Sequence, residues 1–269
     1  MPFITTNHIK IYYHQQGEGD DLILIGGLTA DHQVWKSTLR VFSKHFRVTT
    51  FDNRGAGQSD SPDYPYTTEM MANDTLQLMN ALSIHHAHVV GHSMGGCVAQ
   101  QMAIIAPEKI NKVVIACSRA KPNAIANMIL SMREKLKLQN VNEALLAEYS
   151  IPFLFGENFV ANTAQVNGFI QWTLQNPHPQ SFIGFKNQLH AVINHDVSAE
   201  LHKITAPTLV IAGEEDMLMP AKQLKMLSKI LKKSTFMCIA DCAHMPHVEK
   251  SAEFAEGVIR HLHPSRQMT

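Results

Sequence analysis

Short apolar runs alternate with amphipathic segments over the first 117 residues of the chain. Residues 22–25 are wholly apolar and lead into Gly26-Gly27, a pattern typical of a strand buried on both faces of a sheet. Further strands are predicted at 47–51, 88–90 and 113–116, and helices at 34–42, 68–82 and 95–106. This βαβα order predicts a mainly parallel sheet with helices on both faces. Residues 3–14, before a turn cluster at 17–20, predict an opening antiparallel pair of strands.

The alternation stops between residues 118 and 203, where the pattern is helical and predicts no strand. Helical spacing recurs in two sets, Ile125, Met128, Ile129 and Met132, and Phe182, Phe185, Leu189 and Val192. Such a methionine-rich stripe indicates core packing, with an adaptable pocket lining as the alternative. Strands at 207–212 and 235–239 and helices at 220–231 and 252–261 follow. We therefore expect one α/β core, residues 1–117 and 204–269, interrupted by a helical insert at 118–203.

Composition excludes several classes of protein. Lys plus Arg and Asp plus Glu both number 23, and this balance argues against a nucleic-acid partner, which usually requires a basic excess. The sequence contains no run of 18 or more apolar residues, so we expect no membrane span. The first residues do not resemble a signal peptide. Four cysteines in 269 residues do not indicate a disulfide scaffold. We expect a reduced, cytoplasmic protein.

The strongest chemical signal is Gly91-His92-Ser93-Met94-Gly95, which fits G-x-S-x-G between a predicted strand and a predicted helix. Flanking glycines permit a tight, strained turn that lifts a serine hydroxyl clear of the sheet. The helix that follows offers free N–H groups to a developing negative charge. Ser93 is therefore the predicted nucleophile, and the alternative is a glycine-rich turn with an incidental serine.

A serine nucleophile requires a base, and the base requires an acid that orients it. His244 follows the predicted strand 235–239 and is our choice of base, with His247 as the nearest competitor. Three carboxylates, Glu214, Glu215 and Asp216, leave the sheet after the strand 207–212. The pattern of residues alone does not separate these three.

With Ser93, an acid near 216 and His244 in that order, the chain resembles the α/β-hydrolase family. The family's G-x-x-D pattern selects Asp216, and residues 52–59 resemble its D-x-R-G-x-G-x-S loop, in which Arg54 has no catalytic part. The resemblance implies a sheet of about eight mostly parallel strands, with the insert as a helical lid. It also implies oxyanion donors at the backbone N–H groups of Met94 and Leu28.

Two departures from the family pattern are visible. Gly26-Gly27 replaces the usual His-Gly pair of the oxyanion loop, which leaves the donor in place because it belongs to the backbone. Ala243 stands where the family usually has glycine before its histidine.

Cys238, Cys242, His244 and His247 offer zinc-ligand chemistry, but their spacing is not that of paired ligand doublets. We expect structural cysteines and no metal or other cofactor.

The expected reaction is hydrolysis of a carboxylic ester, or of a related acyl compound, through an acyl-enzyme. Enol-lactone hydrolases, C–C bond hydrolases and pimeloyl-carrier methyl esterases share these motifs, so the small-molecule substrate stays open. Cofactor-free perhydrolase chemistry and a non-catalytic ligand receptor are the remaining alternatives. Epoxide hydrolases and haloalkane dehalogenases are disfavoured because they need a carboxylate nucleophile and position 93 is serine.

Overall fold

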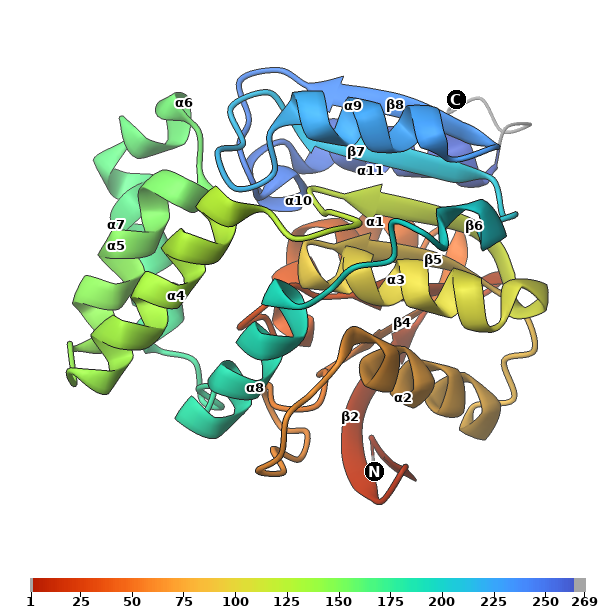
Figure 1. Cartoon of the computed structure of the whole chain (residues 1–269), viewed down its shortest axis with the longest axis horizontal. Helices are drawn as coiled ribbons and strands as arrows, with labels where there is room; N and C mark the ends of the chain where they lie inside the picture. The colour runs from red at the N-terminus through yellow and green to blue at the C-terminus, as the bar shows by residue number, and fades with distance from the viewer. Residues whose placement is uncertain (1, 264–269) are drawn as a thin grey trace.

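An eight-stranded sheet forms the centre of the computed structural model, which describes residues 2–263 (Figure 1). Its spatial order is β1-β2-β4-β3-β5-β6-β7-β8. The strands are β1 (Phe3–Thr6), β2 (Ile9–Gln16), β3 (Asp20–Ile25), β4 (Phe46–Phe51), β5 (Ala87–His92), β6 (Ile110–Ala116), β7 (Thr208–Gly213) and β8 (Ser234–Ile239). β2 pairs antiparallel with β1 and β4, and the pairs from β4 to β8 are parallel. The mainly parallel sheet predicted from the sequence is confirmed.

The antiparallel pair of strands predicted at the start of the chain is confirmed as β1 and β2. Asn7 and His8 join β1 to β2, and both have positive φ angles, 47° and 64°. Asparagine and histidine are among the side chains that enter this region most readily. The cluster at 17–20 instead separates β2 from β3 and lets Gly17 pass close to the backbone of Ser43 and Phe46.

Helices cover both faces of the sheet and create two cores. One face carries α2 (Thr68–Ala81), α3 (Met94–Ile105) and α9 (Ala221–Ile230), and the other carries η1 (His32–Trp35), α1 (Lys36–Phe42), α10 (Pro246–Glu249) and α11 (Ser251–Leu262). Short 3-10 turns, η2 (Pro107–Lys109) and η3 (Leu201–Lys203), precede β6 and β7. Ile23 packs into the first core and Leu24 into the second, because neighbouring side chains of a strand point to opposite faces.

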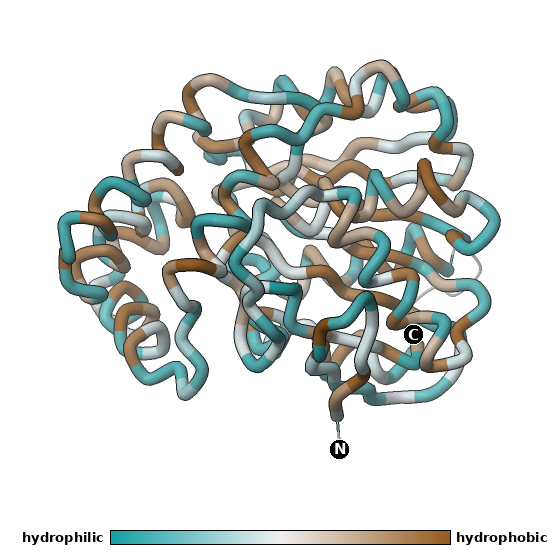
Figure 2. The backbone as a smooth tube through the Cα atoms, turned by 60° about the horizontal axis from the view of Figure 1, so that its bottom comes forward, coloured by the Kyte–Doolittle hydropathy of each residue, from teal (hydrophilic) through white to brown (hydrophobic). Residues whose placement is uncertain are grey.

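A helical insert lies between β6 and β7, beside the carboxyl ends of the parallel strands (Figure 1). Its helices are α4 (Ala124–Leu138), α5 (Glu143–Leu154), α6 (Glu157–Val160), α7 (Thr163–Leu174) and α8 (Phe182–Ile193). Hydrophobic and hydrophilic residues alternate along these helices at the left of Figure 2. Within residues 2–263, no helix combines the length and the apolar character needed to cross a membrane.

The methionine-rich stripe of α4 is not core, and the prediction of core packing is wrong for most of it. Ile125, Met128 and Met132 are 69%, 75% and 42% exposed, and only Ile129 packs against the main core. The stripe of α8 is buried at Phe185, Leu189 and Val192, as its spacing predicts, whereas Phe182 at the start of the helix is 39% exposed. The α4 helix instead turns Ala126 and Leu130 toward the core, so its methionine stripe lies on a different face of the helix.

α8 is fixed to the core through a buried arginine. Arg54 is 2% exposed, and its Nη2 donates to Asp74 Oδ1 of α2 at 2.6 Å. The carbonyl oxygen of Arg54 accepts a hydrogen bond from Gln188 Nε2 of α8 at 2.8 Å. Both of its polar ends are therefore occupied by structural contacts.

Candidate active site

Ser93 occupies a strained turn between β5 and α3. Its φ and ψ are 53° and −116°, a conformation that L-residues rarely adopt. Close packing explains the flanking glycines, because a Cβ on Gly91 would lie 2.2 Å from the Gly95 carbonyl oxygen and one on Gly95 would lie 2.0 Å from that of Ile25. The turn is held by the Ser93 N–H donating to Ala116 O at 2.9 Å and by Ser118 Oγ donating to Ser93 O at 2.7 Å.

His244 reaches Ser93 from the loop after β8. Its Nε2 lies 2.9 Å from Ser93 Oγ, and its ring is almost fully buried. The backbone of His244 is held from both sides, since its N–H donates to Leu154 O at 3.0 Å and its carbonyl oxygen accepts from His92 Nε2 at 2.6 Å. The imidazole therefore meets the serine hydroxyl at hydrogen-bond distance and has little freedom to move away.

Asp216 completes the contact on the other ring nitrogen. Its Oδ2 lies 2.8 Å from His244 Nδ1, and its Oδ1 accepts the N–H groups of Leu218 and Met219 at 2.9 and 2.8 Å. A carboxylate only accepts hydrogen bonds, so Nδ1 carries the proton and Nε2 is left to accept from the Ser93 hydroxyl. Ser93, His244 and Asp216 form one continuous set of hydrogen bonds, called here the Ser–His–Asp set.

The competing residues lie elsewhere. Glu214 is exposed, and Glu215 Oε2 accepts the N–H of Glu157 in the insert at 2.7 Å. His247 packs against Trp35 and His92, with ring centroids 4.8 and 4.4 Å away. Burial lowers the pKa of His247 well below its usual value. Of the three carboxylates and two histidines considered from the sequence, Asp216 and His244 are the pair in contact with each other.

The loop after β3 passes directly beside Ser93. A Cβ on Gly27 would lie 3.2 Å from both Ser93 Cβ and His92 Nδ1, so only glycine fits without displacing them. No hydrogen bond found among residues 2–263 uses the N–H of Leu28, while the next N–H, that of Thr29, donates to Gln188 Oε1 at 3.3 Å. Met94 opens α3, so its N–H has no partner within that helix. Both predicted donors thus belong to backbone adjoining the serine.

Two groups of potential metal ligands occur within the described part of the chain. One is Cys117, Asp216 and His244, which overlaps the Ser–His–Asp set, and the other is Asp31, His32 and Asp52. In the second group His32 Nδ1 already contacts Asp52 Oδ1 at 2.8 Å. The zinc alternative from the sequence does not assemble, because Cys238 is exposed while the Cys242 thiol faces Glu249 Oε1 at 3.6 Å.

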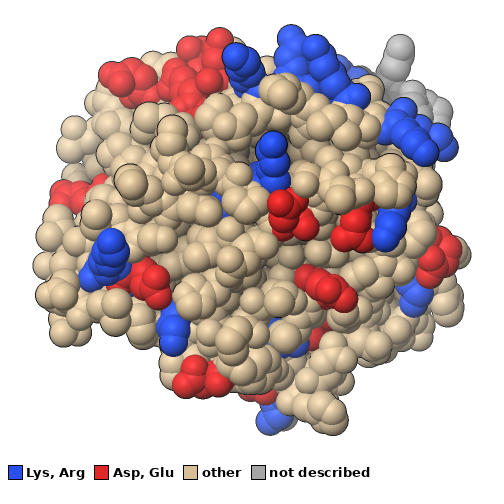
Figure 3. Space-filling view, viewed as in Figure 1, with Lys and Arg blue, Asp and Glu red and all other residues tan. Residues whose placement is uncertain are grey.

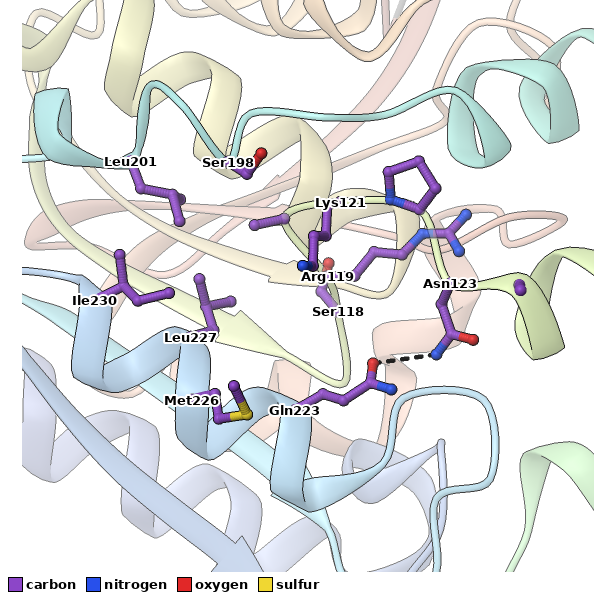
Figure 4. Close-up of a pocket in the computed structure, with 13 residues that line it drawn as sticks. Ser118, Arg119, Lys121, Asn123, Ser198, Leu201, Gln223, Met226, Leu227 and Ile230 are labelled. Carbon is purple, nitrogen blue, oxygen red and sulfur yellow. Dashed lines mark hydrogen bonds between the residues drawn. The ribbon is translucent and has the colours of Figure 1, made fainter.

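A cavity of about 460 Å³ lies between the start of the insert and α9 (Figure 4). Its wall combines the loop from Ser118 to Ala124, the segment around Leu201 and one side of α9. Two of its lining residues are joined by a hydrogen bond, in which Asn123 Nδ2 donates to Gln223 Oε1 at 3.1 Å. Ser118 belongs to this wall and also donates to the Ser93 carbonyl oxygen. The cavity is therefore a neighbour of the serine turn, and the serine hydroxyl does not line it.

The surface carries charges of both signs. On the face shown in Figure 3, Lys and Arg side chains lie close to Asp and Glu side chains at several places. This mixture agrees with the formal net charge of zero. The face shown presents no large field of a single sign toward an approaching ligand.

Two supporting residues escaped the sequence analysis. His92 holds the His244 carbonyl oxygen, and its place inside Gly91–Gly95 was the only available signal. Glu249 accepts the N–H of Ala243 at 3.0 Å and that of Gly156 at 2.8 Å. Nothing in the local sequence marks Glu249, because both partners are backbone groups and Gly156 is distant in the chain.

Comparisons with known proteins agree with the fold described above. The family model of the α/β-hydrolase fold matches residues 22–251. A Pseudomonas syringae protein whose provisional name is carbamate hydrolase RutD is 28% identical over 89% of this chain and 92% of its own length. The 3-oxoadipate enol-lactonase 2 of Acinetobacter baylyi is 25% identical over 95% and 94% of the two chains.

Solved structures point the same way. The enol-lactonase of Burkholderia xenovorans superimposes with a TM-score of 0.87 and 25% identity, covering 97% of this chain and 99% of the other. A thermophilic esterase of Thermogutta terrifontis gives a TM-score of 0.86 at 25% identity, covering 97% of both chains. The chain belongs to the α/β-hydrolase fold family and is a hydrolase by family.

Proposed function

We propose that this protein is a serine hydrolase that cleaves a carboxylic ester, linear or cyclic, through an acyl-enzyme. The observation that carries the proposal is the Ser–His–Asp set, with 2.9 Å between Ser93 Oγ and His244 Nε2 and 2.8 Å between His244 Nδ1 and Asp216 Oδ2. A serine hydroxyl is a weak nucleophile until a base removes its proton, and the set supplies that base and the acid that orients it.

The proposed reaction has two halves. Ser93 Oγ attacks the acyl carbon while His244 Nε2 takes the hydroxyl proton, and the resulting tetrahedral intermediate collapses as His244 returns the proton to the leaving oxygen. The carbon–oxygen bond to the leaving group breaks and the acyl–Ser93 ester remains. Water then attacks this ester with His244 as base, which releases the acid and restores the hydroxyl.

The N–H groups of Leu28 and Met94 are the proposed oxyanion donors. Their backbone adjoins Ser93, and that of Met94 also lies at the N-terminus of α3, where the helix dipole favours negative charge. Removing one such donor typically costs about 2.7–4 kcal/mol of transition-state stabilisation. We assign the insert, residues 118–203, the role of a lid over this site.

An enol-lactone is the specific ester that relatives favour. Two relatives have that name, and their matches to this chain cover at least 94% of the length of each relative. A lactone is a cyclic ester, so its opening follows the two half-reactions above and the leaving group stays attached to the acyl chain. The RutD relative suggests a carbamate as the second candidate, in which an acyl carbon flanked by nitrogen takes the place of the ester carbon.

A substrate panel tests the proposal. p-Nitrophenyl esters of increasing acyl length, an enol-lactone, a carrier-linked methyl ester and a carbamate are offered to the wild type and to Ser93→Ala. We expect turnover of at least one ester or lactone by the wild type and a loss of about 10⁴-fold or more in Ser93→Ala. Equal rates for the two proteins on every substrate would reject Ser93 as nucleophile.

A further inference from the structure

The loops that carry Asp216 and His244 are both tied to one short segment of the insert, residues 154–157. The N–H of His244 donates to Leu154 O at 3.0 Å. The N–H of Glu157 donates to Glu215 Oε2 at 2.7 Å, next to Asp216 in the chain. The N–H of Gly156 donates to Glu249 Oε2 at 2.8 Å. The insert therefore meets the Ser–His–Asp set through backbone groups.

Glu249 lies at the centre of these contacts. While its Oε2 holds Gly156, its Oε1 accepts the N–H of Ala243 at 3.0 Å, the residue directly before His244. The Cys242 thiol approaches the same Oε1 at 3.6 Å. Burial and the Glu249 carboxylate both raise the pKa of Cys242, so the thiol keeps its proton and acts as a donor. One carboxylate thus joins the loop 242–244 to the insert.

Gly156 fits between two carboxylates. A Cβ at this position would lie 2.4 Å from Glu215 Oε2 and 3.3 Å from Glu249 Oε2. Glycine therefore lets both acids reach consecutive N–H groups at the start of α6. Glu249 is half-buried, and burial raises the pKa of its carboxyl above the usual value. An acid retained in such surroundings requires the N–H donors that surround it.

We infer that Glu249 is a positioning residue for His244, acting through the backbone of Ala243 and through the insert segment 154–157. This inference rests on the proposed function. His244 has three backbone restraints, namely His92 on its carbonyl oxygen, Leu154 on its N–H and Glu249 on the preceding residue. Glu249 supports two of the three, because it also holds Gly156, two residues after Leu154. Its removal frees the imidazole to move relative to the Ser93 hydroxyl.

The test measures how fast Ser93 reacts with a fluorophosphonate in Glu249→Gln, Glu249→Ala and the wild type. Glu253→Gln is the matched control, since Glu253 is exposed on α11 only four residues further on. We expect the rate constant to fall about 100-fold in Glu249→Ala, the loss typical of a misplacement of about 1 Å. Glu249→Gln keeps one acceptor oxygen and should fall between the two, and Glu253→Gln should match the wild type.

Amplitude and rate constant separate positioning from stability. A purely structural role lowers the fraction of molecules that react, while each folded molecule reacts at the wild-type rate. A positioning role lowers the rate constant of the folded molecules, and the loss persists at alkaline pH, where the imidazole is neutral.

Wild-type rate constants in both Glu249 variants would overturn the inference. If Glu249→Ala does not fold, a wild-type rate constant in Glu249→Gln alone would overturn it. A wild type that fails to react at all would instead reject the proposed function.

Discussion

Asp216 holds His244 with only one of its two carboxylate oxygens. Oδ2 contacts Nδ1 of the imidazole at 2.8 Å, while Oδ1 is occupied by the N–H groups of Leu218 and Met219. The two backbone donors hold the carboxylate in place independently of its contact with the histidine. The acid therefore orients the ring from a rigid support, and its substitution has a specific consequence.

Asp216→Asn should lose about 10⁴-fold in turnover while the protein stays folded. The asparagine side chain can present its NH₂ to Nδ1, which then becomes an acceptor and leaves the proton on Nε2, the wrong tautomer for accepting from Ser93. Glu214→Gln is the control, because Glu214 is exposed and does not contact His244. Steady-state kinetics on an active ester from the panel provide the measurement. Near-normal turnover in Asp216→Asn would assign the acid elsewhere.

Ester turnover should decrease at acid pH. The proposed base works only as a neutral imidazole, so protonation of the ring at acid pH removes the base. We expect kcat/KM to fall about tenfold for each pH unit on the acid limb. The profile is measured between pH 5 and 9 in buffers of constant ionic strength. A flat profile down to pH 5 is incompatible with His244 as the base.

Gly95→Ala should destabilise the fold strongly. Its new Cβ would lie 2.0 Å from the Ile25 carbonyl oxygen. The clash is with the backbone of β3, which cannot move aside as a flexible side chain could. We expect a loss of about 3 kcal/mol or more in the free energy of unfolding, at the upper end of single substitutions. Gly168→Ala is the contrasting variant, since no atom lies within 4 Å of its Cβ and the site is inside α7.

Alanine is the better helix former at position 168, so Gly168→Ala should gain about 0.5–1 kcal/mol. Urea unfolding of both variants beside the wild type gives the comparison. A Gly95→Ala protein as stable as the wild type would mean that α3 does not pack against the β3 loop as closely as described.

Stability should fall as the pH drops from 7 to 5. Burial, followed by the neighbouring His244, lowers the pKa of His92 to about 3, whereas the unfolded chain titrates near 6.5. Between these two pH values the unfolded state binds a proton that the folded state does not, so acid favours unfolding. His92 alone should remove about 2 kcal/mol from the free energy of unfolding by pH 5.

His247 contributes in the same direction, because burial also lowers its pKa. Urea unfolding at pH 7 and pH 5 measures the total change. His92→Gln keeps a side-chain donor and should reduce the pH dependence by about one proton. An unfolding free energy that is equal at the two pH values would contradict the buried, neutral state of these imidazoles.

Local patterns were sufficient for the sheet and for the serine of the Ser–His–Asp set. A strand that is apolar throughout, such as β3, and a serine between two glycines at a strand-to-helix junction each leave a short-range signal. The order of Ser93, Asp216 and His244 then places all three after parallel strands, whose carboxyl ends share one edge. The acid needed the family resemblance, because three adjacent carboxylates have the same local pattern.

The insert was predicted less well for a physical reason. Helical spacing predicts a helix, but it does not say what the apolar face meets, so the exposed stripe of α4 and the buried stripe of α8 look alike in sequence. Glu249 illustrates a second limit. Its partners are backbone N–H groups of Ala243 and Gly156, and backbone groups give no residue-type signal.

Intact-mass and peptide mass spectrometry after fluorophosphonate treatment test the central claim most directly. We expect one adduct per molecule, located on Ser93 in the wild type and absent from Ser93→Ala. An adduct on another residue, or an unmodified wild type that is folded by circular dichroism, would contradict the assignment of Ser93 as the nucleophile.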